Sequence, residues 1–207
     1  MHEKDQLIVS LTSPYARKAR ITALEKKIDF EMKVDVPWNE DTGVIKLNPL
    51  GKVPVWLTKE GDAIYDSRVI VEYLEIIAEP SLMPENPLDK IKVKQIEALA
   101  DGIMDAALCI FSERRKRPTE LQYQAWVDRQ FGKIHRGLKQ LSDMLGEKPC
   151  FFGDTLSVAD IAVACALGYI GLRFSEDFSW QHKYPHLSRF YDGLMDRPSF
   201  KETVPVA

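Results

Sequence analysis

A stretch with three prolines in ten residues, EPSLMPENPL at 79–88, constrains the fold of this chain more than any other feature. Proline lacks a backbone N–H group and clashes with the preceding helical turn, so no helix continues through such a stretch. Runs typical of strands occur only before it, whereas helical periodicity alone follows it. We therefore expect a linker at 81–88 between a domain at 1–80 and a domain at 89–207.

The part before the linker alternates predicted strands with predicted helices. β-Branched and aromatic residues predict four short strands, at 7–11, 30–36, 53–57 and 63–65. Apolar residues at helical spacing predict two amphipathic helices, at 14–27 and 67–78. Ser13 suits the N-cap of the first helix, and Pro14 suits its first turn, where the missing N–H group costs nothing. This order of elements predicts an α/β domain built around one sheet.

The part after the linker is predicted to be all-α. Its periodicity predicts helices at 89–114, 119–146, 161–172 and 186–195, the second with an apolar stripe that includes Leu121 and Trp126. The third helix is apolar on nearly every face, which is typical of a central, buried helix. Ser157 and Asp160 stand at its start with the spacing of a capping box, in which two side chains satisfy backbone N–H groups reciprocally.

The charge balance gives no reason to expect nucleic acid or an anionic membrane as a partner. The chain carries 28 Lys and Arg against 31 Asp and Glu, a net charge of -3. Its three cysteines form no CxxC pair, which favours a reducing compartment over a disulfide framework. The apolar stretch at 7–11 is too short for a signal sequence or a membrane span, so we expect a cytoplasmic protein. His182 and His186 have Pro185 between them and no completing ligand, so we expect no metal site.

Four segments, in this order along the chain, resemble the cytosolic glutathione S-transferase superfamily. They are TSPYARKARITALEKK at 12–27, NPLGKVPVW at 48–56, YDSRVIVEYLE at 65–75 and GDTLSVADIAVACAL at 153–167. The resemblance extends over the whole chain and is closest to the small bacterial YibF-like group. It implies a thioredoxin-like N-terminal domain, an all-α C-terminal domain, glutathione as co-substrate and a homodimer.

The resemblance assigns Ser13 to the position at which the family activates the thiol of glutathione. A thiol with an ordinary pKa near ~8.5 is mostly protonated at neutral pH, and lowering that pKa by roughly two units requires about 2.7 kcal/mol of thiolate stabilisation. A helix N-terminus contributes about 0.3 to 1 kcal/mol, and a hydrogen bond from a hydroxyl to a charged group about 1.5 to 3 kcal/mol. A serine here is also an ordinary N-cap, and Thr12 is the alternative donor.

Two further segments match positions at which the family contacts glutathione. Val53–Pro54 resembles the family's cis-proline, which turns the preceding backbone towards the cysteinyl part of glutathione. Lys52 matches a position at which related classes contact glutathione, where it could pair with a carboxylate of the peptide. A solvated loop lysine is the alternative role. Asp66 and Ser67 resemble the acidic residue and serine that hold the γ-glutamyl end, with Ser67 on the α-carboxylate and Asp66 on the α-ammonium. Helix capping is the alternative role of this pair, and Asp66 is shorter than the Glu of many relatives.

The resemblance also implies a pocket for a second substrate, a small hydrophobic electrophile. The residues expected to line it are Tyr15, Ile103, Met104, Ala107 and Phe111. The expected reaction is conjugation of the glutathione thiolate to the electrophile, in detoxification, with peroxide reduction or isomerisation as close variants. The alternative is a non-catalytic protein-interaction module, as in the stringent-starvation relatives. A thiol–disulfide oxidoreductase is a third option, but it requires a cysteine at position 13.

Overall fold

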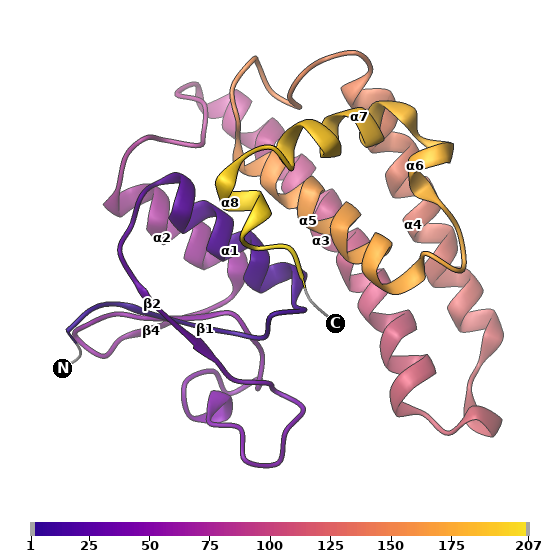
Figure 1. Ribbon diagram of the computed structural model, residues 1–207, viewed down its shortest axis with the longest axis horizontal. Coiled ribbons are helices and arrows are strands. Elements are labelled where there is room, and N and C mark those ends of the chain that lie inside the picture. Colours follow the sequence, from indigo (N-terminus) through magenta and orange to yellow (C-terminus); the bar gives the residue numbers. More distant parts are fainter. Residues whose placement is uncertain (1–2, 206–207) are drawn as a thin grey trace. The chain divides into compact units, whose positions relative to one another are not determined.

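The computed structural model describes residues 3–205, whose contacts group into two compact units (Figure 1). The first unit holds the residues up to Met83 together with those from Arg197 onward, and the second holds Pro84–Asp196. The change of unit falls inside the three-proline stretch, whereas the last residues group with the first unit. One unit has a sheet with helices, and the other has helices alone. The predicted fold class is therefore confirmed.

The first unit is a small mixed sheet with helices. Its elements are β1 (Gln6–Val9), α1 (Pro14–Glu25), β2 (Glu31–Val34), the 3-10 helix η1 (Val44–Lys46), β3 (Val55–Leu57), β4 (Ala63–Ile64), α2 (Ser67–Ile77) and α8 (Pro198–Lys201). The strands run in the order β2-β1-β3-β4, with β1 parallel to β2 and the other pairs antiparallel. They are shorter than predicted because pairing stops where the chain turns out of the sheet; Leu11, for example, lies in a turn and is 37% exposed.

Alternate residues of the central strands bury opposite faces of the sheet. Leu7, Val9 and Trp56 pack with α1 and α2 on one face. Ile8 and Val55 pack with η1 on the other, and Figure 1 shows the two helices and η1 on opposite sides. Because full burial of a side chain such as Leu7 contributes about 1.5 to 3 kcal/mol, a one-residue slip of a strand is strongly disfavoured.

Helix α1 buries cations as well as apolar residues, which differs from the amphipathic helix expected. Arg17 is 1% exposed; its Nη2 donates to the Phe200 carbonyl at 3.2 Å and its Nε to the Thr203 hydroxyl at 3.3 Å. Arg20 donates to the Glu202 carbonyl at 3.2 Å. The chain after α7 therefore returns to α1, and its carbonyl groups satisfy guanidinium donors that a solvated helix face would leave to water.

A buried ion pair anchors the start of the linker. The Lys26 side chain is fully buried, and its Nζ donates to Glu75 Oε1 at 2.9 Å and to the Pro80 carbonyl at 2.8 Å. The Glu75 carboxylate also accepts hydrogen bonds from the Ser81 hydroxyl at 2.9 Å and the Leu82 N–H group at 3.1 Å. Removing one partner of such a pair leaves a buried, uncompensated charge, so these bonds hold the chain at 80–82 against α1 and α2.

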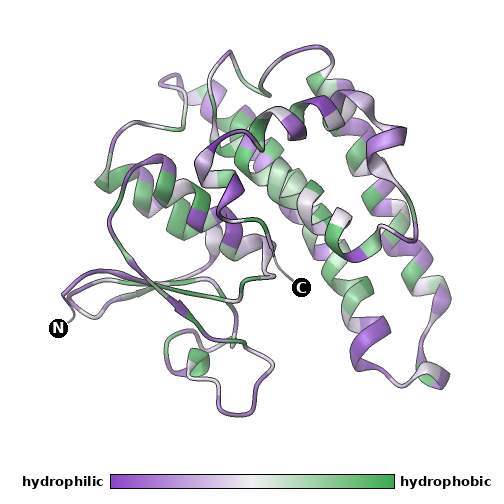
Figure 2. Cartoon of the chain, in the orientation of Figure 1, coloured by the Kyte–Doolittle hydropathy of each residue, from purple (hydrophilic) through white to green (hydrophobic). Residues whose placement is uncertain are grey.

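The second unit is helical throughout. Its elements are α3 (Pro87–Lys116), the 3-10 helix η2 (Thr119–Leu121), α4 (Gln124–Leu145), α5 (Val158–Phe174), α6 (Trp180–Lys183) and α7 (Pro185–Leu194). Helix α5 packs against α3 and α7, and Figure 2 shows few hydrophilic residues along it. Every residue from Val158 to Leu167 is buried, as expected for the central helix.

The predicted capping box at the start of α5 is confirmed. The Asp160 carboxylate is fully buried and accepts hydrogen bonds from the Ser157 hydroxyl at 2.6 Å and the Ser157 N–H group at 2.8 Å. It also accepts the Phe151 N–H group at 2.7 Å. Burial raises the pKa of Asp160, while these hydrogen bonds act to lower it. The carboxylate thus ties the preceding loop to the central helix.

The second long helix starts later than predicted. Leu121 belongs to η2 and is 61% exposed, and Trp126 in the first turn of α4 is 40% exposed, so neither contributes to a buried stripe. The Tyr123 N–H group donates to Glu113 Oε1 at 2.9 Å, which fixes the turn between α3 and α4. Because this N–H group bonds to a side chain and not to the carbonyl four residues earlier, the residues before Tyr123 lie outside α4.

His135 of α4 lies among aromatic side chains. Its ring centroid is 4.7 Å from that of Phe178 and 6.4 Å from that of Phe131. Its Nδ1 atom is sealed from solvent and has no hydrogen-bond partner within residues 3–205. Burial, and then the nearby charge of Lys183, lower the pKa of His135 below its ordinary value. The folded unit therefore favours the neutral imidazole.

We expect the free energy of unfolding to fall as the pH drops below about 6.5, the ordinary histidine pKa. The unfolded histidine binds a proton there while folded His135 resists it, so acid favours the unfolded state until the pH passes the folded pKa. Urea unfolding between roughly pH 5 and 8 should show that acidification lowers the free energy of unfolding less in His135→Phe than in the native chain. The exposed His182 is the control, and His182→Gln should behave as native. An equal fall in the free energy of unfolding in the native chain and in His135→Phe would contradict this account.

Candidate functional site

Three loops meet at one end of the sheet in the first unit. Ile8 pairs with Val55, so the end of β1 lies beside the start of β3. Trp56 pairs with Ile64, so the end of β4 lies there as well. The loops at these strand ends carry all the residues predicted to contact glutathione, namely Ser13, Lys52, Val53, Pro54, Asp66 and Ser67. The topology thus brings together three segments that are far apart in the sequence.

Ser13 is the N-cap of α1, with Pro14 at the first helical position, as predicted. Its Oγ accepts the Ala16 N–H group at 3.2 Å. A hydroxyl also has one proton to donate, and among the described residues no acceptor takes it. The side chain is half-buried at the positive end of a twelve-residue helix. Capping and donation to an anion are therefore compatible roles of the same oxygen.

Thr12, the alternative donor, is engaged differently. Its Oγ1 lies 3.4 Å from Ser10 Oγ, and either hydroxyl can donate to the other. Ser13 has no such side-chain acceptor beside it, so its proton is the more available of the two. This geometry favours Ser13 as the donor.

The Val53–Pro54 peptide bond is cis, as predicted. Val53 is half-buried and Pro54 is buried at the start of β3. Lys52 is exposed; its carbonyl accepts the Asn48 side-chain amide at 2.9 Å, and within residues 3–205 no carboxylate pairs with its ammonium group. The ammonium of Lys52 is therefore available to a ligand carboxylate.

Asp66, not Ser67, caps helix α2. The Asp66 carboxylate accepts the Arg68 N–H group at 2.8 Å, and Ser67 occupies the first helical position. Ser67 is only 3% exposed, yet its hydroxyl forms no hydrogen bond with any described residue. The Ser67 hydroxyl is therefore free to donate a hydrogen bond to a ligand group.

We expect Ser67→Ala to weaken glutathione binding by about 1 to 3 kcal/mol, because a hydrogen bond to a charged group is lost. Stability should change little, since the helix cap is the side chain of Asp66. Asp66→Asn is the companion variant: asparagine caps as well as aspartate, so the helix cap stays while the charge is removed, both for the α-ammonium and for Arg68 Nε at 3.5 Å. Calorimetric titration with glutathione measures both affinities. Native affinity in Ser67→Ala would restrict Ser67 to a structural role.

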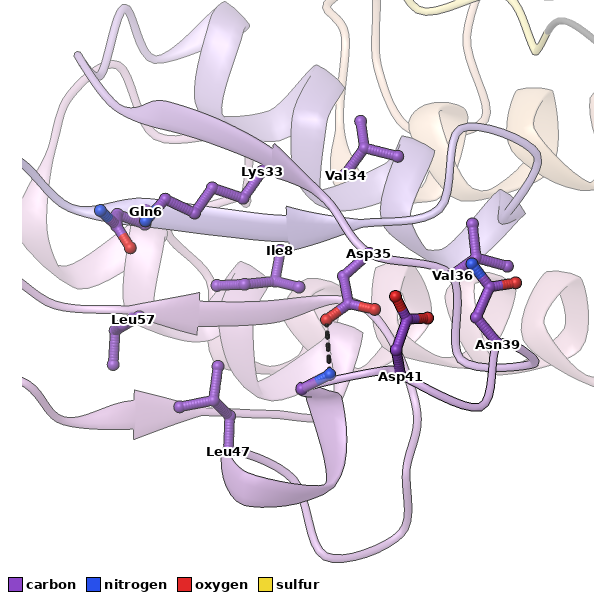
Figure 3. A pocket seen from close by; sticks show the side chains of 11 residues that line it. Gln6, Ile8, Lys33, Val34, Asp35, Val36, Asn39, Asp41, Leu47 and Leu57 are labelled. Carbon is purple, nitrogen blue, oxygen red and sulfur yellow. Dashed lines mark hydrogen bonds between the residues drawn. The ribbon is translucent and has the colours of Figure 1, made fainter.

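A hollow of about 620 Å³ lies on the face of this sheet that packs against η1 (Figure 3). Lys33, Asp35 and Asp41 line it, and none of the residues predicted to contact glutathione does. The Asp35 carboxylate already accepts the Thr42 hydroxyl at 2.7 Å and the Gly43 N–H group at 3.0 Å. This hollow offers no group that suits thiol chemistry, so the strand-end loops are the candidate site.

The residues predicted for the second-substrate pocket lie on two elements. Ile103, Met104 and Ala107 are buried within α3, whereas Phe111 and Tyr15 are half-buried.

The two ends of this α3 set face different helices. Ile103 lies against α4, where a Cβ at Gly137 would come within 2.6 Å of it. Phe111 faces α5, with the Arg173 guanidinium 4.4 Å from its ring centroid. The expected common face therefore holds only in part. The position of Arg173 could not be predicted, because a lone arginine near a helix end carries no sequence signal.

The described residues contain no group of three or more His, Cys, Asp or Glu side chains that could hold a metal ion. Within 3–205, no helix has the length and apolar character needed to cross a membrane.

Comparison with known proteins shows the family of this chain. The model of the glutathione S-transferase N-terminal domain matches residues 12–76, and that of the glutathione S-transferase C-terminal domain matches 124–193. The chain is 43% identical over 201 residues to the uncharacterized GST-like protein YibF of Escherichia coli (strain K12), covering 97% of this chain and 98% of that protein. The chain belongs to the glutathione S-transferase family.

Solved structures of glutathione transferases have the same fold. One from Methylobacillus flagellatus KT, with glutathione bound, has a TM-score of 0.94 and 43% identity, covering 98% of this chain and all of that one. A family member from Pseudomonas fluorescens Pf-5, with bound S-(propanoic acid)-glutathione, has a TM-score of 0.86 and 31% identity, with 98% and 100% covered. The resemblance predicted from the four segments is confirmed.

Proposed function

We propose that this protein binds glutathione at the strand-end loops and activates it as a thiolate for conjugation to a small electrophile. The single observation that carries the proposal is the Ser13 hydroxyl, whose oxygen caps α1 while its proton has no acceptor among the described residues. In the proposed mechanism, Ser13 donates this proton in a hydrogen bond to the glutathione sulfur. That bond and the helix N-terminus together match the roughly 2.7 kcal/mol needed to lower a thiol pKa by about two units.

The neighbouring residues have the groups needed to hold the rest of glutathione. In the proposed complex, the Ser67 hydroxyl donates to the γ-glutamyl carboxylate and Asp66 pairs with the α-ammonium. Lys52 pairs with the glycyl carboxylate, and the backbone of Val53 pairs with the cysteinyl part. No general base is required, because the thiol loses its proton to solvent once the thiolate is stabilised.

Conjugation is favoured over the other uses of the same thiolate. The Pseudomonas fluorescens relative is described with a glutathione thioether, which is the class of product that conjugation generates. The protein-interaction alternative is less well supported, because such a module has no use for an unpaired hydroxyl on Ser13 and Ser67. A disulfide-exchange mechanism lacks its cysteine at position 13. Detoxification, a cytoplasmic location and a homodimer remain part of the proposal on family grounds.

Thermal unfolding with and without glutathione tests the proposal. A ligand at about 100 times its dissociation constant stabilises the folded state by roughly 2.7 kcal/mol, or about 5 to 11 °C for a chain of this size. Cysteinylglycine, which lacks the γ-glutamyl end, is the matched control and should give a much smaller shift. Equal shifts with both compounds, or no shift and no retention on immobilised glutathione, would overturn the proposal.

A further inference from the structure

Strand β2 forms an edge of the sheet and has outward-facing backbone groups. The N–H groups of Glu31 and Asp35 both donate, at 2.9 Å, to carbonyls of the segment 5–9. In a parallel ladder, alternate residues direct both of their backbone groups to the same neighbouring strand, so those of Met32 and Val34 point outward. The strand order places no other described strand on that side. This edge is therefore open to an added strand.

The side chains of β2 alternate between the two faces of the sheet. Met32 and Val34 pair in register with residues of β1 that face α1 and α2, yet they are 42% and 55% exposed. Glu31 and Lys33 therefore lie on the opposite face, where Lys33 and Asp35 line the hollow of about 620 Å³ (Figure 3). The edge thus presents two apolar residues on one face and, on the other, charges in the order negative, positive, negative.

The hollow has room and negative charge for a cationic side chain. Asp41 lines it together with Asp35, and Figure 3 shows both carboxylates at the same end of the hollow. Asp41 is exposed and forms no ion pair with any described residue. In a strand added beside β2, a long basic side chain opposite Asp35 can extend into this end of the hollow and form charge-assisted hydrogen bonds.

The same charges disfavour a second copy of this chain on the edge. Two copies paired antiparallel about Lys33 would place Lys33 opposite Lys33 and Glu31 opposite Asp35. In parallel register, every charged residue would stand opposite its own copy. Like charges directly opposite each other destabilise a strand pair, whereas opposite charges stabilise it. The edge is therefore complementary to a different segment, whose charges run positive, negative, positive.

We propose that the edge of β2 binds an extended segment of a partner protein by strand addition. The segment carries two apolar residues, which pack beside Met32 and Val34 and bond to their backbone groups. On its other face it carries a basic, an acidic and a second basic residue, opposite Glu31, Lys33 and Asp35. This interaction is separate from the proposed glutathione site, whose residues neither line the hollow nor belong to β2.

Two short peptides with reversed charges test the proposal. Arg-Val-Glu-Val-Arg, with both ends blocked, complements the edge in either strand direction, whereas Glu-Val-Arg-Val-Glu places three like charges opposite it. Titration of the isotope-labelled full chain, followed by nuclear magnetic resonance, should give a dissociation constant about tenfold lower for the first peptide, since three charge pairs change sign. The largest amide shifts should fall on Met32 and Val34, whose N–H groups gain hydrogen-bond partners.

Three variants keep the test specific. The native chain should prefer Arg-Val-Glu-Val-Arg over Arg-Val-Arg-Val-Arg, and Lys33→Glu, which changes one exposed charge of the edge, should reverse this preference. Lys46→Glu makes the same change on η1, outside the lining of the hollow, and should keep the native preference. Val34→Pro removes an outward N–H group without the loss of a bond to β1, so it should weaken binding several-fold.

The inference is overturned if neither peptide binds at millimolar concentration, or if the native chain binds the two charge-reversed peptides equally. An unchanged preference in Lys33→Glu, or amide shifts confined to residues outside 31–35, would overturn it as well. If Val34→Pro fails to fold, as judged by circular dichroism, the charge reversal in Lys33→Glu still decides. None of these titrations contains glutathione, so the proposed function stands or fails separately.

Discussion

Ser13→Ala should lower kcat/KM at pH 7 by roughly tenfold to a hundredfold while glutathione still binds, because a hydrogen bond of about 1.5 to 3 kcal/mol to the thiolate is lost. Binding should survive because, in the proposed complex, other loops of the site hold the γ-glutamyl and glycyl ends. The variant also loses the cap on Ala16, which costs about 0.5 to 2 kcal/mol of stability. Steady-state rates with a model electrophile, measured well below the melting temperature, separate the two effects.

Ser13→Thr is the matched control, because threonine keeps both the capping oxygen and the donor proton. It should retain most of the activity that Ser13→Ala loses. Thr12→Val tests the alternative donor and should stay close to native, since the Thr12 hydroxyl lies beside that of Ser10. A large loss in Thr12→Val together with full activity in Ser13→Ala would assign thiol activation to Thr12.

Ser13→Cys offers a gain of chemistry in place of a loss. A thiolate at the helix N-terminus would attack the disulfide of oxidised glutathione, form a mixed disulfide on residue 13 and release one glutathione thiolate. Mass spectrometry after incubation with oxidised glutathione should therefore detect one adduct on this variant and none at this position in the native chain. Absence of the adduct would indicate that bound glutathione does not present its sulfur to residue 13.

Asp160→Ala should destabilise the protein by about 3 to 5 kcal/mol, one of the largest losses we expect from any single substitution. The carboxylate is fully buried and satisfies the N–H groups of Phe151 and Ser157, both of which would lose their acceptor. The damage falls on α5, the most buried helix of the second unit. Urea unfolding monitored by circular dichroism measures the change.

The control for charge loss is Asp143→Ala. Asp143 is 58% exposed and pairs with Lys139 one turn earlier on α4, so its removal should cost no more than about 0.5 kcal/mol. Asp160→Asn keeps one acceptor oxygen and should lie between the other two variants. A loss in Asp160→Ala no larger than that in Asp143→Ala would show that the capping box does not carry the stability of α5.

Local signals predicted well the parts of the fold that depend on local physics. The N-cap at Ser13, the proline at the first turn of α1 and the capping box before α5 each involve residues within one helical turn, so their spacing is visible in the sequence. The cis bond before Pro54 was predicted from family resemblance, since the residues alone do not favour it.

Features that depend on distant partners could not be predicted in the same way. Arg17 is buried because the carbonyl of Phe200, 183 residues later, returns to accept its hydrogen bond. Lys26 is buried because Glu75 and the Pro80 carbonyl meet it from another helix and the linker. Arg173 similarly lies beside aromatic rings of α3 and α5. In each case the hydrophobic pattern describes one element, whereas burial of a charge depends on what folds against it.

The pKa of the thiol in bound glutathione is the most direct test of the central claim. The ultraviolet absorbance of the thiolate, titrated against pH in the presence of saturating native protein, gives this pKa without any electrophile. We predict a value roughly two units below the ordinary thiol value of about 8.5, and a return towards that value in Ser13→Ala. A titration of bound glutathione that coincides with that of free glutathione would contradict thiolate activation, even where binding itself is tight.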